Sequence, residues 1–327
     1  YILNELAKYY YNNHQNDKAK SLYKEIIKNP RFELNEKRHI LNKFRRLVEF
    51  NGELYGFTKS IMIIAADMHP YDPSINLIIA DFTYDSQDYK ESIHYYQRVI
   101  DSKPNDYNAW IQLVTSYYNI LEYDKMSKKS SDALELFPTQ PSFYLYSGIA
   151  RIQLEQYEIG IEILEEGNDL LLSTDKRLKA QFLSSLGDAY HAIGKHEESD
   201  DYFELSLELD SENHFVLNNY AYYLSERNIQ LEKAKIMSRK SNELHPDEAS
   251  FQDTYGWILY KLGDYEKALN WLQKSELNGG NNSAIINEHI GDVYEKLGLR
   301  DKALKYWKLA HHIGGGSDQL LNKLKQK

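Results

Sequence analysis

The stretch DTYGWILYKLGDYEKA, residues 253–268, decides the fold, because a close copy, EHIGDVYEKLGLRDKA, follows 35 positions later at residues 288–303. Three pairs of small residues keep that separation: Gly256 with Gly291, Gly263 with Gly298, and Ala268 with Ala303. A constant period of this size is typical of repeat proteins, in which each unit buries its apolar face against its neighbours. We therefore predict an all-α array of helical hairpins.

The same frame extends upstream over the rest of the 327 residues. It defines about nine units, which start near Tyr1, Asn35, Pro73, Tyr107, Pro141, Ala180, His214, Ala249 and Ala284. The units at 35–72 and 141–179 fit least well. Arg46 stands at a small-residue position of the former, and Gly160 and Gly167 replace alanines in the latter, which we expect to end in a lengthened linker from Ser173 to Lys179.

The residue types at the repeating positions explain the hairpins. Each unit holds two short amphipathic helices, which are stable only when packed. Small residues are expected where the two helices cross, namely Gly187, Ala221, Gly256 and Gly291. A left-handed glycine is expected to end three of the first helices, at Gly194, Gly263 and Gly298. A proline is expected to stop three of the second helices, at Pro104, Pro138 and Pro246.

These residues resemble the tetratricopeptide repeat family, whose pattern of Trp, Leu, Gly or Ala, Tyr, Ala, Phe or Tyr, Ala and Pro recurs in about 34 residues. The resemblance covers essentially the whole chain. It implies a right-handed superhelix over residues 1–316, with a concave groove that is lined mainly by the first helices and binds other proteins. The last three units also resemble a group of Bacteroidetes envelope proteins, many of them lipoproteins. That likeness implies a periplasmic or outer-membrane-associated location.

The two ends of the chain differ. After Gly314-Gly315-Gly316, Ser317 and Asp318 can cap a last helix that runs to Lys327. An apolar stripe of Leu320, Leu321 and Leu324 predicts that residues 317–327 close the array as a solubilising cap, with Asn322, Lys323, Lys325 and Gln326 on the polar side. Tyr1 enters a first helix without such a cap, so we expect further sequence before it.

The resemblance places the partner-binding groove on the inward positions of the first helices. Those positions carry Asp81, Tyr84, Ile111, Tyr118, Ile149, Asp188, His191, Asn218, Tyr222, Asp253, Trp257, Tyr260, Glu288 and Asp292. Aromatic side chains of this kind anchor protein interfaces. The alternative is that several of them are buried by stacking of the repeats. Replacing Trp257 and Tyr222 by Ala separates the two cases, since loss of helicity would assign them to the core.

The charge of the chain bears on its partner. The net charge is −10, which disfavours nucleic acid. Residues 141–213 hold 16 acids against 5 bases, whereas residues 1–70 hold 8 acids against 12 bases. One subclass of the family clamps a C-terminal carboxylate with Lys and Asn. Here the matching positions are Asp188, Asp253, Glu288 and Asp292, which would repel it. We predict a protein or peptide partner that is basic or neutral.

No catalytic or cofactor motif is present. Phosphate-binding loops, the His-Glu-x-x-His motif and a nucleophile elbow are all missing, and the chain has no cysteine. The adjacent histidines His311 and His312 would point in different directions from a helix, so they could not easily bind the same metal ion, even with His289 not far away in the sequence. The longest apolar run, residues 61–66, is too short to span a membrane. We predict a protein that is not an enzyme and holds no cofactor or metal.

Three functional classes remain open. The first is a protein-binding scaffold, either in a bacterial cell-envelope secretion or assembly complex or as a cytoplasmic adaptor. The second is an RNA-binding helical repeat protein, which should carry a basic groove and therefore fits poorly with Asp81, Asp188, Asp253 and Asp292. The third is a regulatory module of a larger enzyme. The identity of the partner and the oligomeric state are not encoded in any motif.

Overall fold

The computed structural model describes residues 2–172 and 174–325. Within these ranges the chain forms nineteen α-helices and two short 3-10 helices without any strand, so the predicted all-α class is confirmed. The chain divides into two compact units, Tyr1–Leu170 and Leu171–Lys327. No helix in the described ranges has the length and hydropathy needed to cross a membrane. The expectations for Tyr1, Ser173, Gln326 and Lys327 lie outside the described residues.

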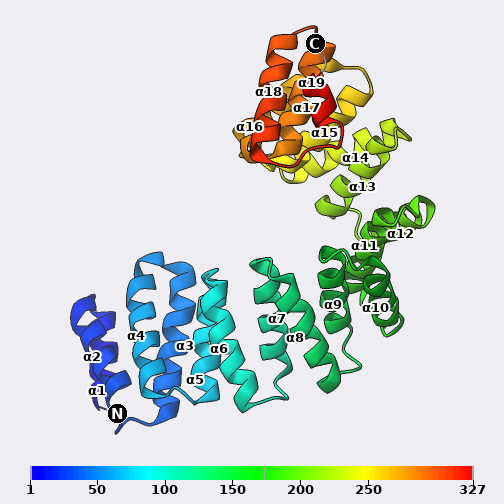
Figure 1. The fold of residues 1–327 in the computed structure, drawn as a ribbon. Helices are drawn as coiled ribbons and strands as arrows, with labels where there is room; N and C mark the ends of the chain where they lie inside the picture. The colour runs from blue at the N-terminus through cyan, green and yellow to red at the C-terminus, as the bar shows by residue number, and fades with distance from the viewer. Residues whose placement is uncertain (1, 173, 326–327) are drawn as a thin grey trace. The chain divides into compact units, whose positions relative to one another are not determined.

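Unit 1 is a row of five helical hairpins, each with a first and a second helix (Figure 1). Its helices are α1 (Ile2–Asn12), α2 (Asn16–Lys28), α3 (Leu34–Phe50), η1 (Gly52–Leu54), α4 (Tyr55–Met68), α5 (Pro73–Asp85), α6 (Tyr89–Ser102), α7 (Tyr107–Asn119), α8 (Tyr123–Leu136), α9 (Pro141–Gln153) and α10 (Tyr157–Asp169). The two helices of a hairpin contact each other, and each second helix also contacts the next hairpin.

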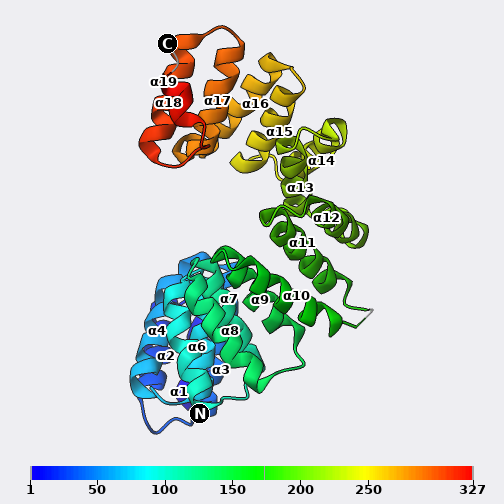
Figure 2. The same cartoon turned by 45° about the vertical axis from the view of Figure 1, so that its right-hand side comes forward.

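Unit 2 holds four further hairpins and a short last helix (Figure 2). Its helices are α11 (Lys176–Ala192), α12 (His196–Leu209), α13 (His214–Glu226), α14 (Leu231–Leu244), α15 (Ala249–Lys261), α16 (Tyr265–Leu277), η2 (Gly280–Asn282), α17 (Ala284–Lys296), α18 (Arg300–Ile313) and α19 (Leu320–Lys325). Contacts between consecutive first helices join α13 to α15 and α15 to α17.

Small residues stand at the helix crossings, as predicted. A Cβ added to Gly187 would lie 2.9 Å from the ring of Phe203, and one added to Gly291 would lie 2.4 Å from Trp307. Ala221 is fully buried. The large ring of the second helix thus fills the space that the glycine of the first helix leaves empty.

The turn inside most hairpins passes through one left-handed residue. Gly194, Gly263 and Gly298 have φ values of +77°, +85° and +74°, which confirms the prediction. Five other hairpins take the same turn without glycine, at His14, Gln87, Leu121, Glu155 and Asn228. The second helices α6, α8 and α14 each end two residues before the predicted prolines, because the residue before a proline disfavours helical geometry.

The two weak units differ from expectation in separate ways. In the hairpin of α3 and α4 the first helix is lengthened to 17 residues and η1 replaces the usual turn, with Arg46 exposed to solvent. In the hairpin of α9 and α10, Gly160 and Gly167 are buried and the helices pack closely, so that a Cβ on Gly148 would lie 3.2 Å from the carbonyl oxygen of Gly160. The linker expected up to Lys179 is shorter, because α11 already begins at Lys176.

The last helix faces the array differently from the prediction. Leu320 is buried and Leu324 half-buried, but Leu321 is 51% exposed. Lys323, expected on the polar side, points inward to two carboxylates of α17. The reason is helical spacing: positions 320, 323 and 324 share one face, and α17 offers acids there rather than an apolar surface.

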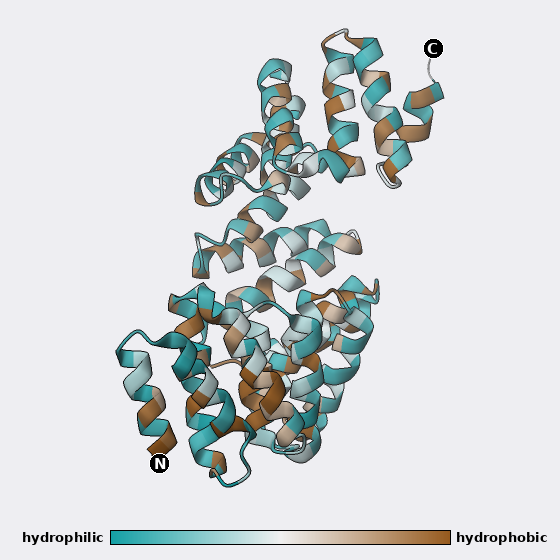
Figure 3. Cartoon of the chain, turned by 90° about the vertical axis from the view of Figure 1, so that its left-hand side faces the viewer, coloured by the Kyte–Doolittle hydropathy of each residue, from teal (hydrophilic) through white to brown (hydrophobic). Residues whose placement is uncertain are grey.

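Each unit has its own hydrophobic core. One cluster of buried side chains runs from Ala7 to Ala150 and lies wholly in unit 1. Two further clusters, built around Phe203 and around Trp307, lie in unit 2. Figure 3 shows hydrophobic and hydrophilic residues alternating within the same helices, as expected when each helix buries one side against its neighbours.

Candidate functional site

The predicted groove residues lie on first helices of both units, and in unit 1 they form a largely uncharged surface. Tyr84 of α5, Ile111 and Tyr118 of α7, and Ile149 of α9 are half-buried or exposed, and Tyr118 keeps 42% of its surface exposed. Tyr146 of α9, which the prediction omitted, joins them. We call these five residues the unit 1 face.

Three tyrosines of the unit 1 face come together from three successive first helices. The rings of Tyr118 and Tyr146 are 6.3 Å apart. Burial raises the pKa of Tyr146 to about 12, and the nearby hydroxyls of Tyr84 and Tyr118 contribute to that rise. Within the described residues, the hydroxyls of these three tyrosines donate no hydrogen bond to another residue. The surface therefore presents phenol rings together with hydrogen-bonding groups that a partner can use.

A hollow lies at the C-terminal ends of α3 and α5. It encloses about 400 Å³ and is lined by Arg45, Val48, Glu49, Gly52, Tyr55, Phe82, Asp85 and Ser86. The rings of Tyr55 and Phe82 stack at 5.6 Å. Its walls therefore combine an apolar side with charged side chains.

The one predicted acid of unit 1 is already paired. Arg45 bridges Asp81 at 3.0 Å and Asp85 at 2.9 Å, and the hydroxyl of Tyr96 donates a hydrogen bond to Asp81 at 2.9 Å. Burial still raises the pKa of Asp81 against the effect of these two partners. The acid thus belongs to the link between α3 and α5 and leaves the tyrosines in nearly neutral surroundings.

The predicted residues of α11 and α13 hold those two helices together. The hydroxyl of Tyr223 donates to Asp188 at 3.0 Å, and the ring of His191 stacks on Tyr223 at 3.6 Å. Burial raises the pKa of Asp188 to about 6, although its hydrogen bonds act in the opposite direction. Burial lowers the pKa of His191 to about 4. Asn218 is buried.

A second set of contacts joins α13, α15 and α17. His289 Nδ1 lies 2.9 Å from a carboxylate oxygen of Asp253, and the Trp257 ring stacks against His289 at 3.9 Å. The indole N–H of Trp257 donates to Glu226 at 2.6 Å. Burial lowers the pKa of His289, but Asp253 and the other nearby carboxylates outweigh it and the net pKa is raised. Asp253 and Trp257 are both buried.

The last two predicted acids contact the chain's own last helix. Lys323 of α19 lies 2.6 Å from Glu288 and 2.6 Å from Asp292, and the indole N–H of Trp307 donates to Asp292 at 2.9 Å.

Two predicted tyrosines, Tyr222 and Tyr260, remain half-buried. Burial first, and neighbouring carboxylates second, raise the pKa of both, that of Tyr260 to about 12.

Comparison with known proteins agrees with this architecture. A tetratricopeptide repeat family model matches residues 180–213 and 249–276, which span the hairpins α11–α12 and α15–α16. These two segments are similar to tetratricopeptide repeats. Repeats of this type build extended surfaces that bind other proteins.

Solved structures share the fold. A tetratricopeptide repeat protein from Parabacteroides merdae superposes with a TM-score of 0.57 at 12% identity, covering 77% of this chain and 97% of the other. A chain of the APC/C hetero-tetramer Cut9-Hcn1 superposes with a TM-score of 0.60 at 13% identity, covering 99% of this chain and 68% of the other. Among the curated proteins none matches this sequence.

The tetratricopeptide frame explains which residues the sequence could place. It locates inward positions of each first helix but not the side chain that the following first helix brings against them. Later helices already supply a hydrogen-bond or ion-pair partner to four of the predicted acids, namely Asp188, Asp253, Glu288 and Asp292. Tyr146 was missed because it stands one position beyond the inward residue Leu145. The only feature of the sequence that pointed to Tyr146 was Tyr118, which stands in the first helix of the preceding repeat.

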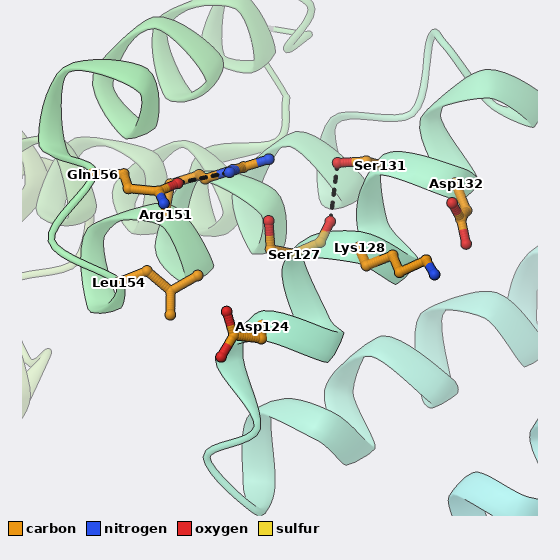
Figure 4. Close-up of a pocket in the computed structure, with 8 residues that line it drawn as sticks. All are labelled: Asp124, Ser127, Lys128, Ser131, Asp132, Arg151, Leu154 and Gln156. Carbon is orange, nitrogen blue, oxygen red and sulfur yellow. Dashed lines mark hydrogen bonds between the residues drawn. The ribbon is translucent and has the colours of Figure 1, made fainter.

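One further hollow lies between α8 and the hairpin of α9 and α10 (Figure 4). It encloses about 340 Å³ and is lined by Asp124, Ser127, Lys128, Ser131, Asp132, Arg151, Leu154 and Gln156. Arg151 donates to Gln156 at 2.6 Å. Small-molecule sites are mostly apolar, and this lining is mostly polar, so we assign it no ligand. Among the described residues, no group of three or more His, Asp or Glu side chains could hold a metal ion.

Proposed function

We propose that this protein is a non-catalytic scaffold that binds a polypeptide segment of a partner protein on the unit 1 face. The observation that carries the proposal is the meeting of Tyr84, Tyr118 and Tyr146 from α5, α7 and α9, with Tyr118 well exposed. Tyrosine gives a large contact area at a low cost in conformational entropy, because it has only two side-chain torsions.

The chemistry of the unit 1 face selects the kind of segment. Ile111 and Ile149 add aliphatic area beside the tyrosines, and Asp81 is paired with Arg45, which it shares with Asp85. A segment with aliphatic or proline side chains would pack on the rings, and its backbone carbonyls would accept hydrogen bonds from the phenols. A neutral or mildly basic segment fits better than an acidic one.

A peptide array tests this assignment. The purified chain is applied to twelve-residue peptides of neutral, basic and acidic composition, and the affinities of the strongest binders are measured by calorimetry. Tyr118→Ala should weaken those binders at least about tenfold, as expected for an aromatic anchor. Tyr71→Ala is the matched control, because Tyr71 is 88% exposed in the turn before α5 and lies off this face.

Two outcomes contradict the proposal. In one, the strongest binders are acidic peptides. In the other, binding is equally sensitive to Tyr118→Ala and Tyr71→Ala, or to neither. Circular dichroism of both variants shows whether the helices are retained.

A finer assignment, to a bacterial cell-envelope secretion or assembly complex, is part of the same proposal. It is supported only by the resemblance of the last three repeats to Bacteroidetes envelope proteins. A cytoplasmic adaptor and a regulatory module of a larger enzyme are the alternatives. Fractionation of the native host, followed by detection of the protein with an antibody, separates the first two. Recovery in the soluble cytoplasmic fraction would reject the envelope assignment.

A further inference from the structure

Helix α3 buries a lysine that has no acidic partner. Lys37, near the start of α3, is 0% exposed, and its ammonium nitrogen lies 3.1 Å from Nε2 of His69. Within the described residues, Lys37 forms no ion pair with a carboxylate. A buried ammonium group is costly unless it is paired, because it gives up the water that solvates its charge. The imidazole of His69 therefore supplies a hydrogen bond that this cation needs.

The contact joins the two ends of one hairpin. His69 is the residue at which α4 ends, and its backbone N–H donates to the carbonyl oxygen of Ala65 at 2.9 Å. Its own carbonyl oxygen accepts from the backbone N–H of Asp72 at 3.1 Å, in the turn that leads into α5. Lys37 thus fastens the beginning of α3 to the end of α4 and to the turn between the second and third hairpins.

The charged groups around His69 are mostly positive. In the described part of the chain, Lys37 and Arg38 of α3 act against a charge on its ring, whereas Asp72 of the turn favours one. That carboxylate is already bound by Arg38, whose Nη2 lies 3.1 Å and 2.9 Å from its two oxygens. A proton on His69 would therefore meet two nearby cations and one acid that is shared with Arg38.

The pair can hold only one hydrogen between its two facing nitrogens. An ammonium nitrogen has no lone pair, so Nε2 of His69 must accept, and the ring is then neutral with its hydrogen on Nδ1. A neutral amine at Lys37 would accept from Nε2–H instead. A further proton places hydrogens on both nitrogens and leaves no acceptor. The two groups would then be cations 3.1 Å apart, one of them fully buried, and would repel each other.

The pKa values of both groups agree with this description. Burial lowers the pKa of His69 below its ordinary value of 6.5, and Lys37 lowers it further. Burial also lowers the pKa of Lys37. A histidine whose pKa is lowered by folding contributes stability that is present above its unfolded pKa and is lost as the pH falls toward the folded value. The contact therefore weakens in the range of mild acid.

We propose that the contact between Lys37 and His69 is a pH-sensitive latch. At neutral pH it holds the beginning of α3 against the end of α4. In mild acid it opens and releases the turn of residues 69–72 between the second and third hairpins. The chain would then respond to acidification at one defined joint. Tyr84 stands near the C-terminal end of α5, whereas this turn precedes its N-terminal end, so the latch is separate from the unit 1 face.

Hydrogen exchange of the full chain at pH 7.5 and at pH 5 tests the proposal. Each rate is expressed as a protection factor, so that the intrinsic effect of pH on exchange cancels. The amides of His69 and Asp72 should lose at least about tenfold in protection at pH 5, because each unit of pKa difference is a factor of ten in the opening equilibrium. In His69→Gln, an oxygen that does not titrate can still accept from Lys37, so protection should stay within about twofold.

The matched control is His39→Gln, the same change at an exposed position of α3. It should lose protection at pH 5 as the unchanged chain does. A second variant, Lys37→Met, removes the cation and keeps an unbranched side chain in the buried space. It should raise the pH at which the ring of His69 titrates in NMR by at least about half a unit, because the repulsion is gone. If His69→Gln does not fold, this variant decides alone.

Four results would overturn the proposal. The first is an equal loss of protection in the unchanged chain and in His69→Gln, and the second is a His69 ring that titrates at or above the ordinary value for histidine. The third is a His69 titration that Lys37→Met leaves unchanged. The fourth is the same loss of protection in the centre of α4 as at residues 69 and 72, because acid would then weaken the whole hairpin and not this joint. None of these results depends on the unit 1 face.

Discussion

At the scale of single residues, Asp188 couples stability to pH. Burial raises its pKa to about 6, whereas the unfolded chain releases that proton near 3.8. Between these values the folded state keeps a proton that the unfolded state has lost, so stability falls as pH rises from about 4 to above 6. The loss amounts to at most about 3 kcal/mol. Asp188→Asn should remove it, which urea denaturation from pH 4.5 to 7 measures.

The difference between the two proteins isolates Asp188 from other titrating groups. The unchanged chain should lose more stability than Asp188→Asn on going from pH 4.5 to 7. Parallel stability curves would contradict the prediction. So would a carboxyl carbon NMR signal of Asp188 that titrates at the ordinary value for aspartate.

For single residues, the sequence predicts where a turn lies better than it predicts which side chain a residue contacts. It places left-handed turns at Gly194, Gly263 and Gly298, because glycine adopts that conformation without strain. It does not place the same turn at Leu121, which has φ +60° and no local reason to adopt it. There the packing of the hairpin overrides the preference of the residue. The same holds for Asp253, whose partner His289 stands 36 positions away.

At the scale of helices, one substitution should have opposite effects at two glycines. Gly291→Ala places a methyl group 2.4 Å from Trp307 and should destabilise unit 2 by about 1–3 kcal/mol through overpacking. Gly56→Ala, in α4, meets nothing within 4 Å and should stabilise unit 1 by about 0.5 kcal/mol, because alanine favours helix. Urea denaturation followed by circular dichroism measures both.

The pair serves as its own control, since the chemical change is the same. A stabilising or neutral Gly291→Ala would mean that α17 and α18 can separate without loss, contrary to the tight crossing. A Gly56→Ala variant that is destabilised by more than about 1 kcal/mol would show an unrecognised contact at α4.

Helix α19 shows where helix-scale prediction ends. Its sequence offers three leucines, and a stripe of all three is the arrangement that an apolar surface would favour. The helical period also allows the face of Leu320, Lys323 and Leu324. The acids of α17 decide between the two, and their depth of burial cannot be known before the hairpins are stacked. Short helices carry too little periodicity to settle such a choice alone.

At the scale of the whole molecule, two compact units imply two unfolding steps. In the part of the chain that the structure describes, the cluster from Ala7 to Ala150 lies in unit 1, and the clusters around Phe203 and Trp307 lie in unit 2. Trp110 lies in unit 1, whereas Trp257, Trp271 and Trp307 lie in unit 2. Tryptophan fluorescence of a Trp110→Phe variant therefore reports unit 2 alone, while circular dichroism reports all helices. The two urea curves should not coincide.

Gly291→Ala in the Trp110→Phe background sharpens this measurement. It should move the fluorescence midpoint to lower urea and move only part of the circular dichroism curve. If both curves shift together by the same amount, the chain unfolds as a single cooperative array. Repeat proteins can behave in either way, depending on the strength of the interface between neighbouring repeats.

The 35-residue period was enough to predict the hairpins, since spacing and small residues act locally. It was not enough to predict the division near residue 170. That division falls between α10 and α11, where the expected linker stands, and it follows from how the contacts within each unit are distributed after folding. The unit 1 face is a proposal that sequence reached in part: Tyr84 and Tyr118 were among the predicted groove residues, whereas Tyr146 was found only from packing.

The links between first helices have a consequence for how this gene can change. Four junctions use different chemical pairs: Arg38 with Asp72 and Arg45 with Asp81 between α3 and α5, Tyr223 with Asp188 between α11 and α13, His289 with Asp253 between α15 and α17, and Lys323 with Glu288 between α17 and α19. Units that share a shape are therefore not interchangeable, because a transplanted hairpin would arrive with the wrong donor for its new neighbour. Recombination that shuffles or deletes one 35-residue block would strand a buried acid. The hairpins that share such a pair must therefore stay next to each other in the chain.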